Sequence, residues 1–464
     1  MTDPKFNTAF LLRISLISAL GGFLFGYDWV VIGGAKFFYE RFFDLVATPH
    51  LQGLAMSSAL LGCIPGALFA GYLSDKFGRK PTLIWAAVLF TLSALGSGLA
   101  SDFTVFMIFR ILGGIGIGLA SCISPIYIAE VSPRKMRGKF VSLNQFNIVI
   151  GILAAQLTNF LIAREVPMGA TDEFIRNSWN GQMGWRWMFW AEMIPAGVFF
   201  ILAFFLPESP RWMIKMKREE QASLTLKKIG GPEYANSVVL EVRESFREVV
   251  QKMNYGELRK HSLRPILIVG MVLAAFQQWC GINIVFNYAE EVFTSAGFGI
   301  SDALLNIVIT GVVNLVFTLV AMRVVDGWGR RKLMLFGSLG LAATYVFLGA
   351  AFHLEWNGFL VLSIIVIALA VYAMSLAPIT WVVLSEIFPN RVRGAAMAVA
   401  TTTLWIASAL LVLLFPLIKD WIQISGAFWL YALICVAGFL FIRKRLPETK
   451  GRSLEEIEEV FKKD

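Results

Sequence analysis

The sequence DKFGRK at residues 75–80 returns as DGWGRRK at residues 326–332. Two further pairs of similar motifs follow the same order: EVSPRKMRG (130–138) with EIFPNRVRG (386–394), and PESPR (207–211) with PETKG (447–451). A nearly constant spacing of about 250 residues between the members of each pair indicates an internal repeat. The chain is therefore predicted to consist of two halves that arose by duplication.

The residues between these motifs are strongly apolar. Of the 464 residues, 57% are hydrophobic and 16% are charged, whereas about 25% of the residues in soluble proteins are charged. Too few polar residues remain to cover a surface exposed to water. This composition excludes a soluble enzyme, a nucleic-acid-binding protein and a small secreted domain held by disulfides. It predicts a protein with many membrane spans.

Twelve apolar segments have or approach the length of about 20 residues that a membrane helix needs. They are residues 10–34, 52–74, 81–100, 103–128, 139–163, 185–206, 264–293, 302–325, 333–353, 358–385, 393–418 and 424–443. The first is too long for the apolar part of a signal peptide. Since the number of spans is even, both termini are expected on the same side of the membrane.

Lysine and arginine are divided unevenly between the two sides. Most of the 41 lie on the side that holds both termini. The other side holds only Lys36, Arg41, Arg164, Arg176, Arg186 and Lys419. Because basic residues are retained in the cytoplasm, both termini are predicted to be cytoplasmic. The net charge of +9 then requires no nucleic-acid partner, and the lipid bilayer is the expected surrounding.

One long polar segment separates the two sets of six spans, and its pattern is that of short amphipathic helices. The expected organisation is an N-terminal six-helix bundle (1–207), a cytoplasmic helical linker (208–263), a C-terminal six-helix bundle (264–445) and a cytoplasmic tail (446–464).

Cysteine and histidine give no sign of a metal site, a cofactor or an enzyme. The four cysteines lie in apolar runs without the spacing of metal ligands, and core packing is favoured over a disulfide. Membrane-embedded hydrolases and acyltransferases typically need a histidine beside an acid or a nucleophile. The histidines His50, His261 and His353 all lie at or beyond the ends of spans.

Five amide side chains lie inside apolar spans, where polar groups are costly and usually face a cavity. They are Gln145, Gln277, Gln278, Asn283 and Asn314. An amide both donates and accepts hydrogen bonds, which suits a ligand whose hydroxyl groups do the same. Gln278 and Asn283 project from similar sides of a helix, especially if Gly281 loosens it. The residues alone leave equal weight to a second interpretation, in which the amides join neighbouring helices.

A carboxyl group and a guanidinium also lie within spans. Apolar surroundings disfavour the ionised form of Asp28, whereas Arg110 stays charged. If the two approach each other, Asp28 is stabilised as a carboxylate, and if they separate it should take up a proton. Such a pair can couple transport to protons. The alternative is a static ion pair, and coupling is favoured because ions within a membrane are usually functional.

Taken together, a set of motifs resembles the sugar porters of the major facilitator superfamily over nearly the whole chain. They are GYDWVVIGG (26–34), GYLSDKFGRK (71–80), GGIGIG (113–118), PIYIAEVSPRKMRG (125–138), NQF (144–146), PESPRW (207–212), QQWCGIN (277–283), VDGWGRRK (325–332), the run at 381–394 and PETKG (447–451). The resemblance is greatest to bacterial proton-coupled xylose and hexose symporters, and more distant to animal glucose facilitators.

The resemblance implies an all-α membrane protein with the major facilitator fold, in which twelve transmembrane helices form two six-helix bundles. It favours sugar binding by the amides over helix joining, and it assigns proton coupling to Asp28 and Arg110. It also implies that Trp381 contacts the sugar, rather than lying in an interfacial belt of aromatic residues. Trp405 is a weaker candidate for the same role. Phe25 is a candidate cavity residue for which core packing is nearly as well supported.

Three positions depart from the pattern of the family. Ile152 stands where a bacterial xylose-carrying member has glutamine and glucose facilitators have an apolar residue. Asn287 replaces a usual tyrosine, and Leu404 replaces an amide. Each changes the hydrogen bonds that the cavity can offer, so the choice between xylose and glucose stays open.

A second set of charges lies at the cytoplasmic ends of the spans in both halves. They are Asp75, Arg79, Glu130, Arg137, Asp326, Arg330, Glu386 and Arg393. The resemblance implies that these charges bias which side of the transporter is open, while anchoring of the topology is the simpler alternative. Glu192 is compatible with this network or with the path of proton coupling.

The expected function is proton-coupled symport of a neutral monosaccharide, similar to xylose or glucose, by alternating access. The alternatives are a facilitative uniporter of the same fold and, less favoured, a transporter of another class of substrate. The expected location is a bacterial inner membrane, and the expected oligomeric state is a monomer.

Overall fold

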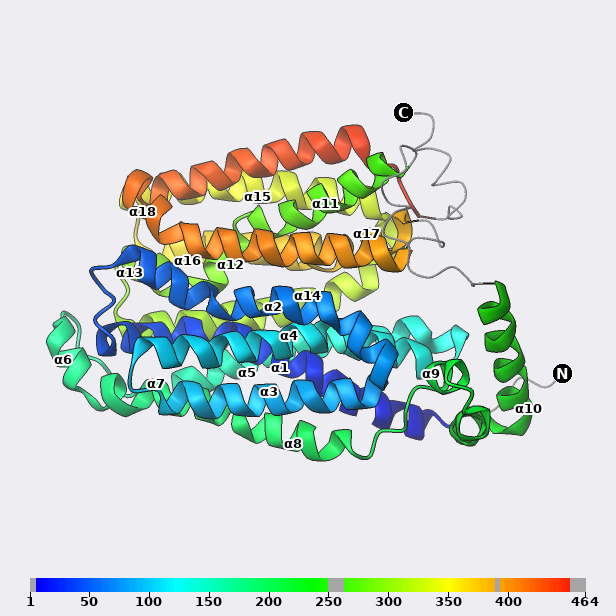
Figure 1. Cartoon of the computed structure of the whole chain (residues 1–464). Helices are drawn as coiled ribbons and strands as arrows, with labels where there is room; N and C mark the ends of the chain where they lie inside the picture. The colour runs from blue at the N-terminus through cyan, green and yellow to red at the C-terminus, as the bar shows by residue number, and fades with distance from the viewer. Residues whose placement is uncertain (1–5, 249–262, 389–392, 451–464) are drawn as a thin grey trace.

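The computed structural model describes residues 6–248, 263–388 and 393–450. These ranges are almost wholly helical and contain no β-strand (Figure 1). The helices of the first half are α1 (Thr8–Phe42), α2 (Pro49–Phe77), α3 (Arg79–Leu99), α4 (Phe103–Val131), α5 (Arg137–Ile162), α6 (Asp172–Asn177), α7 (Trp185–Ala191) and α8 (Met193–Ala203). A 3-10 turn (Arg134–Met136) precedes α5, and a π-helical turn (Asn180–Gly184) precedes α7.

The second half repeats this arrangement. Its helices are α11 (Arg264–Trp279), α12 (Ile282–Asn287), α13 (Ala289–Ser295), α14 (Ile300–Trp328), α15 (Arg330–His353), α16 (Gly358–Met374), α17 (Leu376–Ile387) and α18 (Arg393–Arg445). Between the halves lie α9 (Pro210–Lys215) and α10 (Glu219–Glu248).

Local sequence signals explain where several of these helices begin. The side chains of Asp102 and Asn357 each accept a hydrogen bond of 3.0 Å from a backbone N–H in the first turn of α4 and α16. Such N-caps satisfy a donor that the helix leaves without a partner. In the repeated motif, Gly78 (φ 107°) and Gly329 (φ 88°) separate α2 from α3 and α14 from α15. A positive φ at glycine turns the chain within a single residue.

Within the described ranges, eleven helical stretches are long and apolar enough to cross a membrane. The longest, α18, has 53 residues and is broken at Gln423, where φ is 61° and ψ is 173°. The break divides α18 into two crossings, which correspond to the predicted spans at 393–418 and 424–443. The arrangement therefore contains the twelve crossings that the sequence predicts.

The helices of the two halves run side by side along the long axis of the molecule (Figure 1). The start of α1 and the end of α18 lie at one end of the molecule, together with α9 and α10, and we call this the terminal face. The loops around α6 and α13 lie at the other end, which we call the opposite face.

The linker helices pack on the first half. The backbone N–H of Asn7 donates a hydrogen bond to the carbonyl of Ile229 over 2.8 Å. The rings of Phe6 and Tyr234 meet edge to face, with their centroids 5.2 Å apart. These contacts join α10 to the residues that lead into α1.

The two halves contact each other towards the opposite face. The backbone N–H of Val166 donates to the hydroxyl of Ser301 over 3.1 Å. The α2 helix packs so closely on α18 that Gly53 lies against the backbone carbonyl of Leu413. The halves are thus held together at this end of the molecule.

Candidate functional site

The helix that carries most of the predicted amides is broken between them. α11 ends at Trp279 and α12 begins at Ile282. Gly281 lies in the break with φ of 92°, in the left-handed region that glycine adopts without strain. The break lets the side chain of Asn283 reach back to Gln278.

Four buried side chains form one chain of hydrogen bonds at this break. Asn283 donates to the side-chain oxygen of Gln278 over 2.6 Å, and Gln278 donates to that of Gln277. Gln277 in turn donates to the hydroxyl of Tyr372 on α16 over 2.7 Å. None of the four residues is more than 8% exposed. Because every member is an amide or a hydroxyl, any of these bonds can be exchanged for one to a hydroxyl of a ligand.

Two predicted aromatic residues meet across the boundary between the halves. The rings of Phe25 on α1 and Trp405 on α18 lie 5.7 Å apart, centroid to centroid, and meet edge to face. The indole N–H of Trp405 is buried and has no hydrogen-bond partner among the described residues. A buried donor without a partner is unfavourable, so this group is available to a ligand.

The other predicted sugar-binding residues lie apart from the hydrogen-bonded chain. Gln145 on α5 and Trp381 on α17 are half-buried, and Asn314 on α14 is buried. No hydrogen bond links these three to the chain among the residues that the structure describes.

The three positions that depart from the family pattern are all buried. Ile152 and Leu404 bring apolar surface, being 4% and 2% exposed. Asn287 donates to the backbone carbonyl of Asn283 over 2.9 Å, which ties it to the same broken helix.

Asp28 and Arg110 are in direct contact, as the sequence allowed. The Asp28 side chain is fully buried and accepts a hydrogen bond from the Arg110 guanidinium. Arg110 also donates to the backbone carbonyl of Asp28 over 3.0 Å, and it lies 5.4 Å from the ring centre of Phe189. Glu192, at the junction of α7 and α8, is fully buried, and neither of its carboxylate oxygens has a partner among the described residues.

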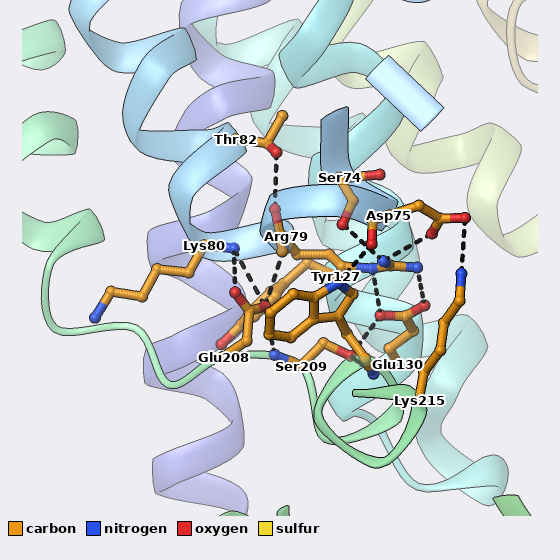
Figure 2. Close-up of polar contacts among 12 residues, drawn as sticks. Ser74, Asp75, Arg79, Lys80, Thr82, Tyr127, Glu130, Glu208, Ser209 and Lys215 are labelled. Carbon is orange, nitrogen blue, oxygen red and sulfur yellow. Dashed lines mark hydrogen bonds and ion pairs between the residues drawn. The ribbon is translucent and has the colours of Figure 1, made fainter. Parts of the chain in front are cut away.

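A third cluster lies at the terminal face of the first half (Figure 2). Arg79, the first residue of α3, makes two hydrogen bonds of 2.9 Å to Glu130 and one of 3.1 Å to Asp75. The hydroxyl of Ser209 donates to the same Glu130 over 2.5 Å. Glu208 accepts hydrogen bonds from the backbone N–H groups of Arg79 and Ser209, over 3.0 Å and 2.7 Å.

The second half repeats the main contacts of this cluster. Arg330 donates two hydrogen bonds to Glu386, over 3.2 Å and 3.1 Å. The hydroxyl of Thr449 donates to Glu386 over 2.6 Å, and Glu448 accepts from the backbone N–H of Arg330 over 2.9 Å. The ion pairs seen here are therefore formed within each half, Arg79 with Glu130 and Arg330 with Glu386.

The roles of Glu208, Ser209, Glu448 and Thr449 were not anticipated from the sequence. The available signal was the repetition of Pro-Glu followed by a hydroxyl residue at 207–209 and 447–449. Burial raises the pKa of the Glu208 carboxyl, and the backbone donors that surround it oppose this effect.

Of the remaining charges predicted at the terminal face, the structure describes the side chain of Arg137, whereas those of Asp326 and Arg393 lie outside the described residues. Arg137 donates to the backbone carbonyl of Ala129 over 3.0 Å.

The fold is that of a helical membrane protein with two similar halves, each of which holds buried polar groups. The family described as "Sugar (and other) transporter" matches residues 14–461, so the chain belongs to this family. Its activity is thus transport rather than enzymatic catalysis.

Individual relatives agree with this assignment. The D-xylose-proton symporter of Escherichia coli (strain K12) is 38% identical, over 99% of this chain and 97% of the relative. The glucose facilitated diffusion protein of Zymomonas mobilis (strain ATCC 31821 / ZM4 / CP4) is 35% identical, over 97% of each. A partially occluded, inward-open structure of the E. coli xylose transporter has a TM-score of 0.84 at 38% identity, over 96% of this chain and all of the other. This likeness confirms the predicted major facilitator fold.

Proposed function

We propose that this protein carries a neutral monosaccharide, similar to xylose or glucose, into the cell together with a proton. The observation that carries the proposal is the fully buried pair of Asp28 and Arg110. A carboxyl group at this depth has two stable states, ionised beside the guanidinium or protonated away from it. The name of the E. coli relative supports coupling to protons.

The hydrogen-bonded amides are the proposed sugar site. Gln277, Gln278 and Asn283 are already joined in one chain, and Gln145, Asn314 and Trp381 are proposed to add contacts from other helices. Phe25 and Trp405 are proposed to close the site by laying apolar rings against the sugar. We propose no cofactor and no metal.

In a transporter that works by alternating access, each of the two faces is assigned to one side of the membrane. The halves contact each other at the opposite face, and the structure resembles one described as inward-open. We therefore propose that the terminal face is cytoplasmic, as the basic residues predict, and that the opposite face is the outer one. We propose that the first bundle ends at residue 207, the linker at residue 263 and the second bundle at residue 445. The protein is proposed to be a monomer in a bacterial inner membrane. The arginine clusters of the terminal face are proposed to bias which face is open.

A facilitative uniporter is the second candidate, and the Zymomonas relative favours it. A symporter and a uniporter differ in the sugar gradient that each can sustain. A membrane potential of ~100 mV acting on one charge supplies about 2.3 kcal/mol, enough for roughly a 40-fold sugar gradient. A uniporter sustains no gradient.

The test is the uptake of labelled xylose and glucose into vesicles, with and without an imposed proton gradient. The parent protein should accumulate one of the sugars only when the gradient is present. Asp28→Asn keeps the shape of the side chain but cannot cycle a proton. It should still bind and exchange the sugar, because neither step moves a net proton, and it should fail to accumulate it.

Accumulation by Asp28→Asn at the level of the parent would place the proton route elsewhere, and Glu192→Gln is then the variant to test. If the parent equilibrates sugar but never concentrates it under a proton gradient, the protein is a uniporter.

A further inference from the structure

A buried group of charges lies at the opposite face, away from Asp28 and from the arginine clusters. Its centre is Lys36 on α1, which is 2% exposed. The Lys36 ammonium lies 2.6 Å from a carboxylate oxygen of Glu291 and 3.4 Å from one of Glu290, both on α13. It also lies 3.0 Å from Glu40, one turn further along α1.

These contacts cross between the two halves. Lys36 and Glu40 belong to the first half, and Glu290 and Glu291 belong to the second. The ammonium also lies 5.6 Å from the ring centre of Tyr288, a second-half residue whose hydroxyl donates to the carbonyl of Val412 over 2.6 Å. Opening of the opposite face would separate Lys36 from its second-half partners. Of these carboxylates, Lys36 would then keep only its contact with Glu40.

The group contains more acids than bases. Beside the three buried carboxylates there are Lys36 and Arg41, which lies 3.6 Å from Glu290 and 2.7 Å from the more exposed Asp172. One oxygen of Glu40 and one of Glu291 have no hydrogen-bond partner among the described residues. Without Lys36, the carboxylates of α1 and α13 would therefore repel each other across the boundary.

The cluster is also next to the proposed sugar site. α13 follows α12, which carries Asn283 and Asn287, after the single residue Tyr288. The backbone carbonyl of Phe286 on α12 lies against Gly33, three residues before Lys36. A movement that pulls α13 away from Lys36 therefore also moves the outer side of the amide site.

We propose that Lys36, Glu290 and Glu291 form an outer lock, an ion-pair gate that holds the opposite face closed while the terminal face is open. A contact that exists in only one of two states shifts the equilibrium towards that state. Close charge pairs at buried interfaces couple strongly enough to change an equilibrium constant about 10-fold or more. The outer lock rests on the proposed alternating access, but not on the identity of the sugar or on proton coupling.

The test measures the opening of the opposite face directly, by the distance between two spin labels in the full-length protein in lipid. One label is placed at Glu173→Cys on α6 and the other at Leu354→Cys after α15, and both positions are exposed. The four native cysteines are replaced by alanine. The measurement uses no sugar and no proton gradient, so its outcome does not depend on what the protein carries.

Lys36→Met should increase the open population at this face about 10-fold. Glu290→Gln combined with Glu291→Gln should also increase it, by less than Lys36→Met, because it removes the repulsion between the halves together with the attraction. Glu40→Gln is the matched control, since it removes a buried carboxylate from the same helix as Lys36 but leaves the contacts across the boundary intact. It should leave the halves closed.

Two results would overturn the outer lock. The first is that the distance between the spin labels changes in neither lock variant. The second is that Glu40→Gln opens the face as much as Lys36→Met does. If Lys36→Met does not fold, the Glu290→Gln/Glu291→Gln variant decides by the same criterion.

Discussion

At the scale of single residues, buried polar groups were the most informative part of the sequence. Asp28 and Arg110 are 82 positions apart and form a buried contact. Phe25 and Trp405 come from opposite ends of the chain, and their rings meet. Polar side chains inside apolar spans were predicted to face a cavity because the bilayer offers them no partner, whereas Phe25 and Trp405 were candidates for contact with the sugar.

The amide chain leads to a prediction about affinity. Gln278→Ala and Asn283→Ala should each weaken sugar binding by about 1 to 3 kcal/mol, roughly 5- to 150-fold, because each leaves a hydroxyl of the ligand without its partner. Isothermal titration in detergent measures the change. Gln182→Ala is the control and should bind normally, because among the described residues the Gln182 side chain bonds only to the backbone carbonyl of Arg176, near the opposite face. Unchanged affinity in both test variants would move the site elsewhere.

The partners of these residues could not be predicted from the sequence. Tyr372 accepts from Gln277 across 95 positions, and no motif pointed to it. Likewise, Lys36 was noted only as one of the few basic residues on the outer side. Which side chains meet depends on how whole helices pack. The sequence of a single span does not indicate which side faces a neighbour, because the span is apolar on most of its faces.

At the scale of the elements, the existence of the spans was predictable, but their breaks were less so. Length and composition predicted each crossing. The sequence suggested only that Gly281 loosens its helix, whereas the structure divides that span into α11 and α12. The sixth crossing is likewise divided, into α7 and α8, beside Glu192. These interruptions depend on the neighbouring helices that satisfy the freed backbone groups.

The break at Gly281 gives a prediction about stability. Gly281→Ala would force a side chain into the left-handed region and place its Cβ 2.8 Å from atoms of Tyr431. The strain should lower the free energy of unfolding by about 1 to 3 kcal/mol, and it should weaken sugar binding because Asn283 is displaced. Thermal unfolding in detergent and sugar titration test the two effects.

Gly71→Ala is the control for this change. Gly71 lies in α2 with an ordinary helical backbone and open space around its Cβ position, so alanine should be neutral or slightly stabilising there. Equal effects of the two substitutions would mean that the break at Gly281 is not under conformational constraint.

At the scale of the whole molecule, the duplication extends beyond the repeated motifs to the contacts they make. Glu208 and Glu448 hold the starts of α3 and α15 in the same way, through the backbone N–H groups of Arg79 and Arg330. The hydroxyls of Ser209 and Thr449 bond to Glu130 and Glu386. The repeat therefore predicted equivalent places in the fold, while the chemistry at those places became evident only from the packing.

This equivalence predicts that each cluster stabilises its own half. Glu208→Gln keeps the size of the side chain but replaces one acceptor oxygen by an N–H₂ group that faces backbone donors. The start of α3 should become easier to open by about 1 to 2 kcal/mol, which is roughly a 5- to 30-fold faster amide exchange. Hydrogen exchange read by mass spectrometry should show this change in α3 and not in α15.

Glu448→Gln is the reciprocal variant and should accelerate exchange in α15 alone. The other half of each variant is its internal control, because the described contacts of Glu208 and Glu448 stay within their own halves. If either substitution accelerated exchange equally in both helices, the two clusters would be coupled through the whole molecule. A cluster that acts within one half fixes the shape of a rigid body. In this state, ion pairs that cross between the halves lie at the opposite face, where Lys36 contacts Glu290 and Glu291 and is placed to lose those contacts when the halves move.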